Sequence, residues 1–190
     1  MLIVDQLIKF LDQFQTTSEA SKEAIKRISN SIHVQKNTDL QAIGKTCKTI
    51  YFIKKGIARI YYLKDGLDVT ESFAWENQII VRVESLFTNK PSSKAIQVLE
   101  DTEIISIDAN KLFALYDEFH DIERLFRKVF EASHVETINR IESIQFHSAE
   151  ERYHNLMKEF PEVIKRVQLK YIASYLGITQ VSLSRIRAHH

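Results

Sequence analysis

The chain has 190 residues, 44% of them hydrophobic and 27% charged, and its formal net charge at pH 7 is +1. These values are typical of a globular protein with one large or two small domains, and they argue against polyanion binding over the whole surface. No apolar run approaches the length that crosses a bilayer, so no membrane partner is expected. The single Cys47 cannot form an intrachain disulfide, which fits a cytoplasmic protein.

The first part of the chain predicts two short helices. Apolar residues recur at helical spacing between Leu2 and Phe14, and Ser18 is placed to cap a second helix that ends near Ile28. Both helices are expected to pack against a larger unit.

Residues 32–107 predict antiparallel β-sheet. Short β-rich runs alternate with turns that contain Gly44, Gly56 and the pair Asp65-Gly66. Asp-Gly between two apolar runs is a strong hairpin signal, because both turn positions tolerate positive φ. Since no helix is expected between these strands, they predict a sandwich or a rolled-up barrel of about 75 residues.

A long helix is predicted from Asp121 to Gln145, after a shorter helix capped by Asp108. Its apolar residues, mostly three or four apart, are Ile122, Leu125, Phe126, Val129, Phe130, Ala132, Val135, Ile138, Ile141 and Ile144. One small roll cannot cover a stripe of this length, so we favour a coiled-coil-like seam with a second copy. Burial within the same domain is the alternative, and it suits the first half. A two-fold dimer would also place two recognition helices about one DNA turn apart.

The long helix is expected to end at a hinge around position 147. Ser148 and Glu151 form a capping-box pattern that opens a new helix, which stops before Pro161. We therefore expect a sensor domain at residues 1–120, a dimerisation helix at 121–146 and a DNA-binding domain at 147–190.

The end of the chain predicts a helix-turn-helix unit. Ile172, Ala173 and Leu176 give its first helix an apolar face, and Gly177 suits the left-handed residue that ends that helix. Thr179 is then placed to cap the second helix. In such a unit the second helix lies in the DNA major groove.

Local charge favours DNA as the partner of this unit over another protein. The segment from Val163 to His190 has five basic residues and no acidic one. Gln180, Ser184 and Arg185 are expected to contact bases. Phosphates are expected to be held by Lys165, Arg166, Lys170, Thr179 and Arg187. The full predicted DNA-binding set is Lys165, Arg166, Lys170, Thr179, Gln180, Ser182, Ser184, Arg185 and Arg187.

The sequence shows no sign of an enzyme. It lacks the glycine-rich, serine-elbow and paired-cysteine motifs of common nucleotide-binding, hydrolytic and redox enzymes. None of its histidines has a second histidine or a cysteine three or four residues away, as common metal-binding motifs do. No catalytic residue, metal or cofactor is therefore expected.

Taken in order, these elements resemble the cyclic AMP receptor/fumarate-nitrate regulator (Crp/Fnr) family of bacterial transcription factors, and its short Bacteroidetes-type branch in particular. The most specific segments are 51–66, 143–162 and 169–187. The resemblance implies an α+β fold with N-terminal helices, an antiparallel β-roll similar to a cyclic-nucleotide-binding jelly roll, a long dimerisation helix and a C-terminal helix-turn-helix. It implies a homodimer that binds double-stranded DNA at a palindromic promoter site, with an unknown small-molecule effector and RNA polymerase as further partners.

The resemblance does not carry over the ligand. The family's cyclic-nucleotide cassette has a Gly-Glu pair and, further on, an Arg that neutralises the cyclic phosphate, whereas this chain has no Gly-Glu and places Ser93 near the Arg position. A phosphate buried without that Arg would cost on the order of several kcal/mol. We therefore expect no cyclic AMP binding, and an effector pocket that includes Glu84, Ser92, Ser93 and Lys94.

Two alternative functions remain open. The protein could be a cyclic-nucleotide sensor that uses Lys94 in place of the Arg, or a small-molecule sensor or scaffold whose helical hairpin contacts protein. A single cysteine cannot hold an iron–sulfur cluster. Gln180-Val181 stand where relatives that read the cyclic AMP operator have Arg-Glu, so the operator should differ.

Overall fold

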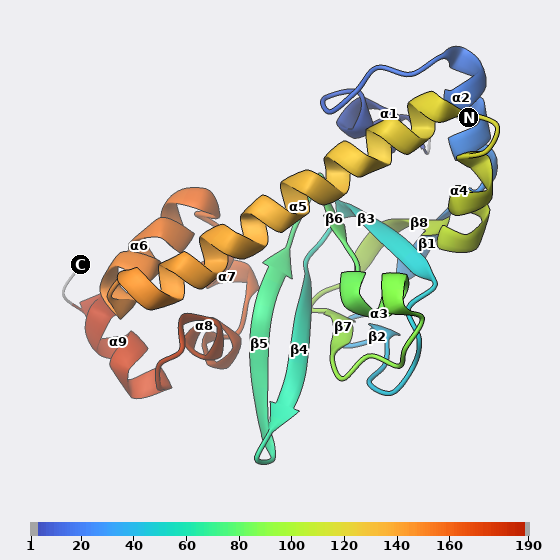
Figure 1. The fold of residues 1–190 in the computed structure, drawn as a ribbon. Helices are drawn as coiled ribbons and strands as arrows, with labels where there is room; N and C mark the ends of the chain where they lie inside the picture. Colours follow the sequence, from blue (N-terminus) through green and yellow to red (C-terminus); the bar gives the residue numbers. More distant parts are fainter. Residues whose placement is uncertain (1–3, 189–190) are drawn as a thin grey trace.

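The computed structural model describes residues 4–188 of the chain (Figure 1). Two short helices come first, α1 (Asp5–Leu11) and α2 (Glu19–Arg27). The predicted cap of the second is confirmed, because the Ser18 hydroxyl accepts a hydrogen bond from the Ser21 amide at 3.1 Å. Asp121 accepts hydrogen bonds from the Ser18 amide (2.9 Å) and the Ser21 hydroxyl (2.7 Å), which fixes α2 to the start of the long helix.

Two antiparallel four-stranded sheets form the β-roll, with strand orders β1-β8-β3-β6 and β2-β7-β4-β5. The strands are β1 (Ser29–Val34), β2 (Asp39–Gln41), β3 (Thr49–Lys55), β4 (Ala58–Lys64), β5 (Leu67–Ala74), β6 (Gln78–Ile80), β7 (Ala95–Val98) and β8 (Thr102–Asp108). Buried residues that include Ile53, Ile60, Ile96 and Ile104 form the core of the roll. The predicted antiparallel fold is confirmed, as a pair of sheets and not as a closed barrel.

The turns follow their sequence signals closely. Lys64 pairs with Leu67 across a two-residue turn in which Asp65 has φ 52° and Gly66 has φ 77°. Gly56 also needs to be glycine, because its φ is 114° and an added Cβ would lie 2.4 Å from the Thr102 hydroxyl oxygen. The Asp65-Gly66 turn pairs β4 with β5, whereas Gly56 lies between β3 and β4, which belong to different sheets.

The expectation that no helix separates the strands is wrong in one place. Helix α3 (Val83–Thr88) lies between β6 and β7. Its six residues are too few to show a 3.6-residue apolar period, which is why the pattern of the sequence does not reveal it.

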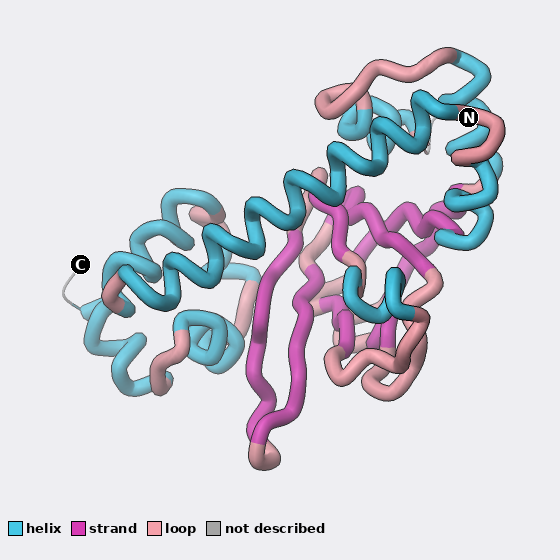
Figure 2. Tube along the Cα trace, viewed as in Figure 1, coloured by secondary structure: helices cyan, strands magenta, loops and turns pink. Residues whose placement is uncertain are grey.

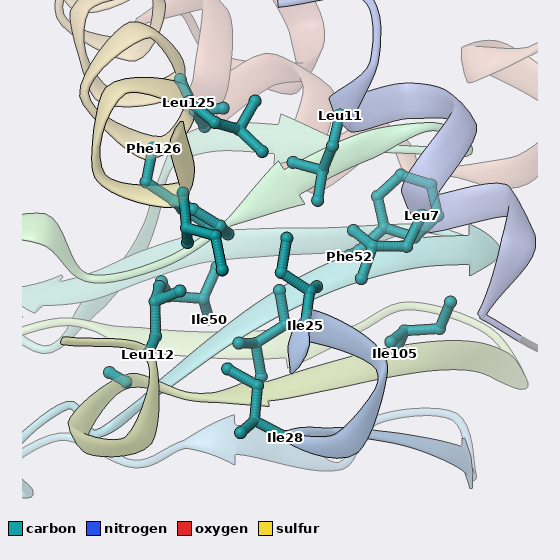
Figure 3. Close-up of a cluster of buried hydrophobic side chains, with 14 of the residues drawn as sticks. Leu7, Leu11, Ile25, Ile28, Ile50, Phe52, Ile105, Leu112, Leu125 and Phe126 are labelled. Atoms are coloured by element: carbon teal, nitrogen blue, oxygen red, sulfur yellow. The ribbon is translucent and has the colours of Figure 1, made fainter. Parts of the chain in front are cut away.

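The N-terminal helices, the roll and the start of the long helix share one core. Buried side chains from α1, α2, β3, α4 (Ala109–Leu115) and α5 (His120–Phe146) meet there, among them Leu7, Ile25, Phe52, Leu112 and Phe126 (Figure 3). Each of these five side chains is fully buried. This core fixes the direction in which α5 leaves the roll.

Helix α5 crosses the molecule from the N-terminal helices to the C-terminal ones (Figure 1). Its buried residues, Ile122, Leu125, Phe126 and Val129, all lie in the first half. In the second half an apolar stripe of Val135, Ile138, Ile141 and Ile144 is 40–57% exposed. Burial within the same chain, the alternative considered above, therefore describes the first half of α5, whereas the apolar stripe of the second half is left uncovered by this chain.

Four helices follow α5 in the described residues and are called here the terminal helical unit: α6 (Ala149–Glu159), α7 (Val163–Arg166), α8 (Leu169–Leu176) and α9 (Gln180–Ala188). The predicted capping box opens α6, since Ser148 and Glu151 exchange side chain to backbone hydrogen bonds of 2.7 and 3.2 Å. His147 is extended between α5 and this box. No helix in residues 4–188 is long and apolar enough to cross a membrane.

Candidate nucleic-acid interface

Helices α8 and α9 have the geometry of a helix-turn-helix. Gly177 ends α8 in the left-handed conformation (φ 70°, ψ 29°), and the Ile178 amide donates to the Ala173 carbonyl at 3.0 Å. The Thr179 hydroxyl accepts from the Ser182 amide at 3.1 Å and so caps α9. Leu183 is the buried side chain of α9 and anchors it to the rest of the unit. The left-handed conformation expected of Gly177 and the capping role expected of Thr179 are confirmed.

The outer side of α9 carries the side chains that were predicted to contact bases. Gln180, Ser184 and Arg185 are exposed, and so is Arg187 two positions after Arg185. Ser182 is half-buried, and its hydroxyl lies 3.0 Å from the Thr179 hydroxyl, within the cap. The helix therefore presents amide, hydroxyl and guanidinium groups outward, which are the groups that read base edges.

The basic residues ahead of α9 have different surroundings. Lys165 is exposed and forms an ion pair with Glu162 at 3.1 Å, and Lys170 is exposed with its Nζ 4.7 Å from the Tyr171 ring centroid. Arg166 instead turns toward the β-roll. Its guanidinium lies 2.6 Å from a Glu76 carboxylate oxygen and 2.5 Å from a Glu100 carboxylate oxygen.

The terminal helical unit packs against β4 and β5 of the roll, and α8 lies beside β5 (Figure 2). Trp75 stacks on Phe160 with ring centroids 4.6 Å apart, and Phe73 packs on Tyr175 at 5.1 Å. The Thr70 amide donates to the Ser174 hydroxyl at 3.1 Å. These contacts join residues about a hundred positions apart in sequence, and no local pattern predicts them.

Arg59 is the buried polar centre of this contact and is 1% exposed. Its guanidinium forms two hydrogen bonds to Asp68, of 2.5 and 2.6 Å, and further ones to Thr70 and Gln97. The same group lies 3.7 Å from the centroid of the Tyr171 ring on α8. Arg59 is thus fully satisfied, and it links the roll to the helix-turn-helix.

The C-terminal end of α8 is held from two other helices. Arg152 of α6 donates to the Leu176 carbonyl at 2.7 Å, and Arg140 of α5 donates to the Tyr175 carbonyl. The Arg140 guanidinium also lies 3.8 Å from the Tyr175 ring centroid, and burial lowers the pKa of this arginine below its usual value. Because helix C-termini attract cations, both arginines favour this placement of α8.

Part of the predicted effector pocket belongs to a hydrogen-bonded group, the Glu71 cluster, made up of Glu71, Arg82, Ser92 and Lys94. Lys94 pairs with Glu71 at 2.8 Å, and the buried Ser92 hydroxyl lies 3.3 Å from the Arg82 Nε. Arg82, 8% exposed, lies 3.5 Å from the same Glu71 carboxylate. The exposed Glu84 and Ser93, also predicted for the pocket, are not members of this cluster.

Sequence reasoning missed two members of the Glu71 cluster. Arg82 stands in the apolar run IIVRV. A charged residue within an apolar run is the one signal in the sequence that could have pointed to a buried, paired cation. Glu71 is the unpaired residue where the β4–β5 register shifts, since Ile60 pairs with Ser72 and Tyr61 with Thr70. A register shift of this kind is a β-bulge, and β-bulges often change the direction of a side chain next to a functional site.

No group of three or more His, Cys, Asp or Glu side chains in residues 4–188 is arranged to hold a metal ion.

A family model and a curated protein each match part of the chain. Residues 31–119 match the family model described as the cyclic nucleotide-binding domain. The "Anaerobic regulatory protein" of Bacillus subtilis (strain 168) is 33% identical over 92 residues, which is 47% of this chain and 38% of that protein. The match therefore spans well under half the length of this curated relative.

Solved structures of similar fold extend over nearly the whole chain. A proposed transcriptional regulator of the Crp/Fnr family from Eubacterium rectale has a TM-score of 0.71 at 18% identity, covering 90% of this chain and 82% of that one. FixK2 from Bradyrhizobium japonicum has a TM-score of 0.70 at 17% identity, covering 85% and 84%. The c-di-GMP responsive global regulator CLP of Xanthomonas campestris has a TM-score of 0.67 at 14% identity, covering 90% and 91%. At these identities the likeness establishes the fold.

Proposed function

Since residues 31–119 belong to the cyclic nucleotide-binding domain family and the chain has the fold of Crp/Fnr-type transcription regulators, we propose that this protein is a homodimeric, DNA-binding transcription regulator. The observation that carries the proposal is the outer side of α9. It presents Gln180, Ser184 and Arg185 to solvent, on a segment that has no acidic residue from Val163 onward. A duplex would meet there a positive field and groups that pair with base edges.

The uncovered half of α5 supports a dimer. The apolar stripe of Val135, Ile138, Ile141 and Ile144 is 40–57% exposed in the single chain, and a second α5 packed along it would remove it from water. Phe87 of α3 is 56% exposed and stacks edge-on against Phe130 of α5 at 5.0 Å, so the apolar surface continues onto the roll. A two-fold seam here would pair two copies of α9 for the two halves of a palindromic site.

Selection of bound sequences from a random duplex pool tests the function directly. We expect enrichment of a palindrome whose half-sites are about one helical turn apart. Affinity for that sequence should fall steeply with added salt, because bound phosphates release counterions. Failure to enrich any sequence, with binding to other proteins that is insensitive to salt, would instead favour a scaffold whose hairpin contacts protein.

Arg185→Ala and Lys170→Ala should separate base contacts from phosphate contacts. Loss of Arg185 is expected to cost about 1–3 kcal/mol on the selected site and to relax specificity at one base pair, whereas loss of Lys170 should weaken all sequences alike and lower the salt slope by about 1. Fluorescence anisotropy on the selected site, a single-base variant and an unrelated duplex measures both effects. Equal losses of all three duplexes in both variants would contradict the assigned roles.

We infer that the β-roll does not bind cyclic AMP. A cyclic phosphate needs a cation that is not already engaged, and Arg82 and Lys94 both lie against Glu71. The Ser92 hydroxyl is engaged as well, since it donates to the Lys94 carbonyl at 2.8 Å. A phosphate would have to displace the Glu71 carboxylate, which is 36% exposed, from both cations while a second negative charge stayed close to it, which is unfavourable.

Thermal denaturation with cyclic AMP checks this inference. A ligand present at about a hundred times its Kd stabilises the folded state by about 2.7 kcal/mol, which for a chain of this size raises Tm by roughly 5–10 °C. We expect no shift at about 1 mM cyclic AMP. A shift that disappears in Lys94→Ala would instead identify a cyclic-nucleotide sensor that uses this lysine.

A further inference from the structure

Three charged side chains form a contact between the β-roll and the terminal helical unit, called here the latch: Glu76, Glu100 and Arg166. Arg166 is the last residue of α7. Its two terminal nitrogens lie 2.6 and 3.0 Å from the two oxygens of Glu76, and one of them lies 2.5 Å from Glu100. Glu76 lies between β5 and β6, and Glu100 lies between β7 and β8. Two turns of the roll thus converge on one guanidinium.

The latch is arranged in advance and stays charged at neutral pH. The Gly56 amide donates to Glu76 at 2.8 Å, so a contact within the roll orients this carboxylate independently of Arg166. Partial burial alone would raise the pKa of Glu76, but the hydrogen bonds from Arg166 and Gly56 hold it below its usual value. The same carboxylates raise the pKa of Arg166. Since a lowered acid pKa lends stability that is lost only as pH falls through it, the latch should open in acid and not near neutrality.

A carboxylate pair in this position competes with DNA. A guanidinium group donates two parallel hydrogen bonds to a carboxylate or to a phosphate in the same way. Arg166 lies just ahead of α8, the helix that in a helix-turn-helix crosses the DNA backbone, and it belongs to the predicted phosphate-contacting set with Lys165 and Lys170. While the latch is closed, Arg166 is occupied and two negative charges lie where a phosphate would approach.

From this geometry we propose that the β-roll inhibits DNA binding through the latch, with Glu76 and Glu100 taking the place of a DNA phosphate on Arg166. The proposal rests on the proposed function, because it assumes that the terminal helical unit binds DNA. Opening the latch would also loosen the neighbouring stack of Trp75 on Phe160, which joins the same two parts of the chain. Trp75 is the only tryptophan in the sequence, so its emission reports on that contact.

The test is the double variant Glu76→Gln/Glu100→Gln in the full chain. It keeps the side-chain shapes but removes both charges that hold Arg166. We expect its affinity for the selected duplex to rise roughly tenfold, within the usual range of coupling between sites. Without DNA, Trp75 emission should move to longer wavelength as the ring becomes hydrated. Far-ultraviolet circular dichroism checks that the fold is unchanged.

Two matched controls separate the latch from a general effect of charge. Glu103→Gln removes a carboxylate from the same roll that pairs with Lys54 at 2.7 Å, and it should leave both affinity and emission unchanged. Glu162→Gln removes a carboxylate beside Lys165, within the terminal helical unit, and it should leave the emission unchanged with a gain in affinity well below tenfold. In an Arg166→Ala background, the glutamine pair should give no further gain.

The outcomes distinguish this proposal from the proposed function. If wild type and Glu76→Gln/Glu100→Gln bind DNA equally, or if the gain persists without Arg166, the latch is overturned and DNA binding stands. A gain of the same size in Glu162→Gln also overturns the latch, because simple loss of negative charge would then explain it. If no variant binds DNA, the proposed function fails and the inhibition fails with it, whatever the emission of Trp75 reports about the contact itself.

Discussion

Replacing Ile138 and Ile141 together with glutamate should make the protein monomeric and weaken its binding to a palindromic site by roughly a hundredfold or more. Both side chains belong to the apolar stripe of α5 and are 40% and 46% exposed in the single chain, so the substitutions should leave the fold intact. In a dimer they would place four carboxylates in an apolar seam, where like charges repel and lose their hydration. Light scattering gives the mass, and titration with a full site and a half-site gives the loss of paired binding.

Asn139→Glu is the matched control for this prediction. It adds a carboxylate to the same helix at an exposed position beside the stripe, and it should leave the protein dimeric. A double glutamate variant that keeps the mass of a dimer would show that the stripe is not the seam.

Leu183→Ala should lower the free energy of unfolding of the helix-turn-helix by about 2–5 kcal/mol and abolish specific DNA binding. Leu183 is fully buried and is the side chain that anchors α9 to α8 and the rest of its apolar cluster, so truncation leaves a cavity under the recognition helix. Hydrogen exchange should show α9 opening before the roll does, because the roll has a separate core.

Val181→Ala is the comparison within the same helix. Val181 is 63% exposed, so its truncation should change stability by no more than about 0.5 kcal/mol. The prediction fails if the two variants unfold at the same denaturant concentration.

The elements that sequence reasoning predicted well have a local physical cause. Asp65-Gly66 forms the hairpin turn, Ser148 and Glu151 form the capping box, and Gly177 ends α8, because each depends on backbone conformations that few residue types adopt. The apolar period predicted α5 in the same way, with ends within one residue of those observed. For such features a window of a few residues holds all the information that is needed.

What sequence reasoning missed depends on contacts between distant parts of the chain. The acid-free segment after Val163 was judged within its own window, yet Arg166 meets carboxylates 66 and 90 residues earlier. Arg82 and Arg59 stand in β-rich apolar runs, and their carboxylate partners, Glu71 and Asp68, both come from β5. Charge pairing across a fold has no period and no fixed spacing, so composition alone assigned Arg166 to DNA and left the other two unassigned.

Strand β5 lies between the two regions of the roll that matter most to the proposed function. The carboxylate of Glu71 belongs to the cluster with Arg82 and Lys94, while the next residue back, Thr70, binds Arg59 and the Ser174 hydroxyl of α8. The two regions are therefore one peptide unit apart, and a molecule that drew Glu71 away from Lys94 would pull on the backbone against which α8 rests. If an effector binds there, a lineage could exchange one effector for another by altering only the lining around residue 71, and the contact with α8 would be inherited unchanged.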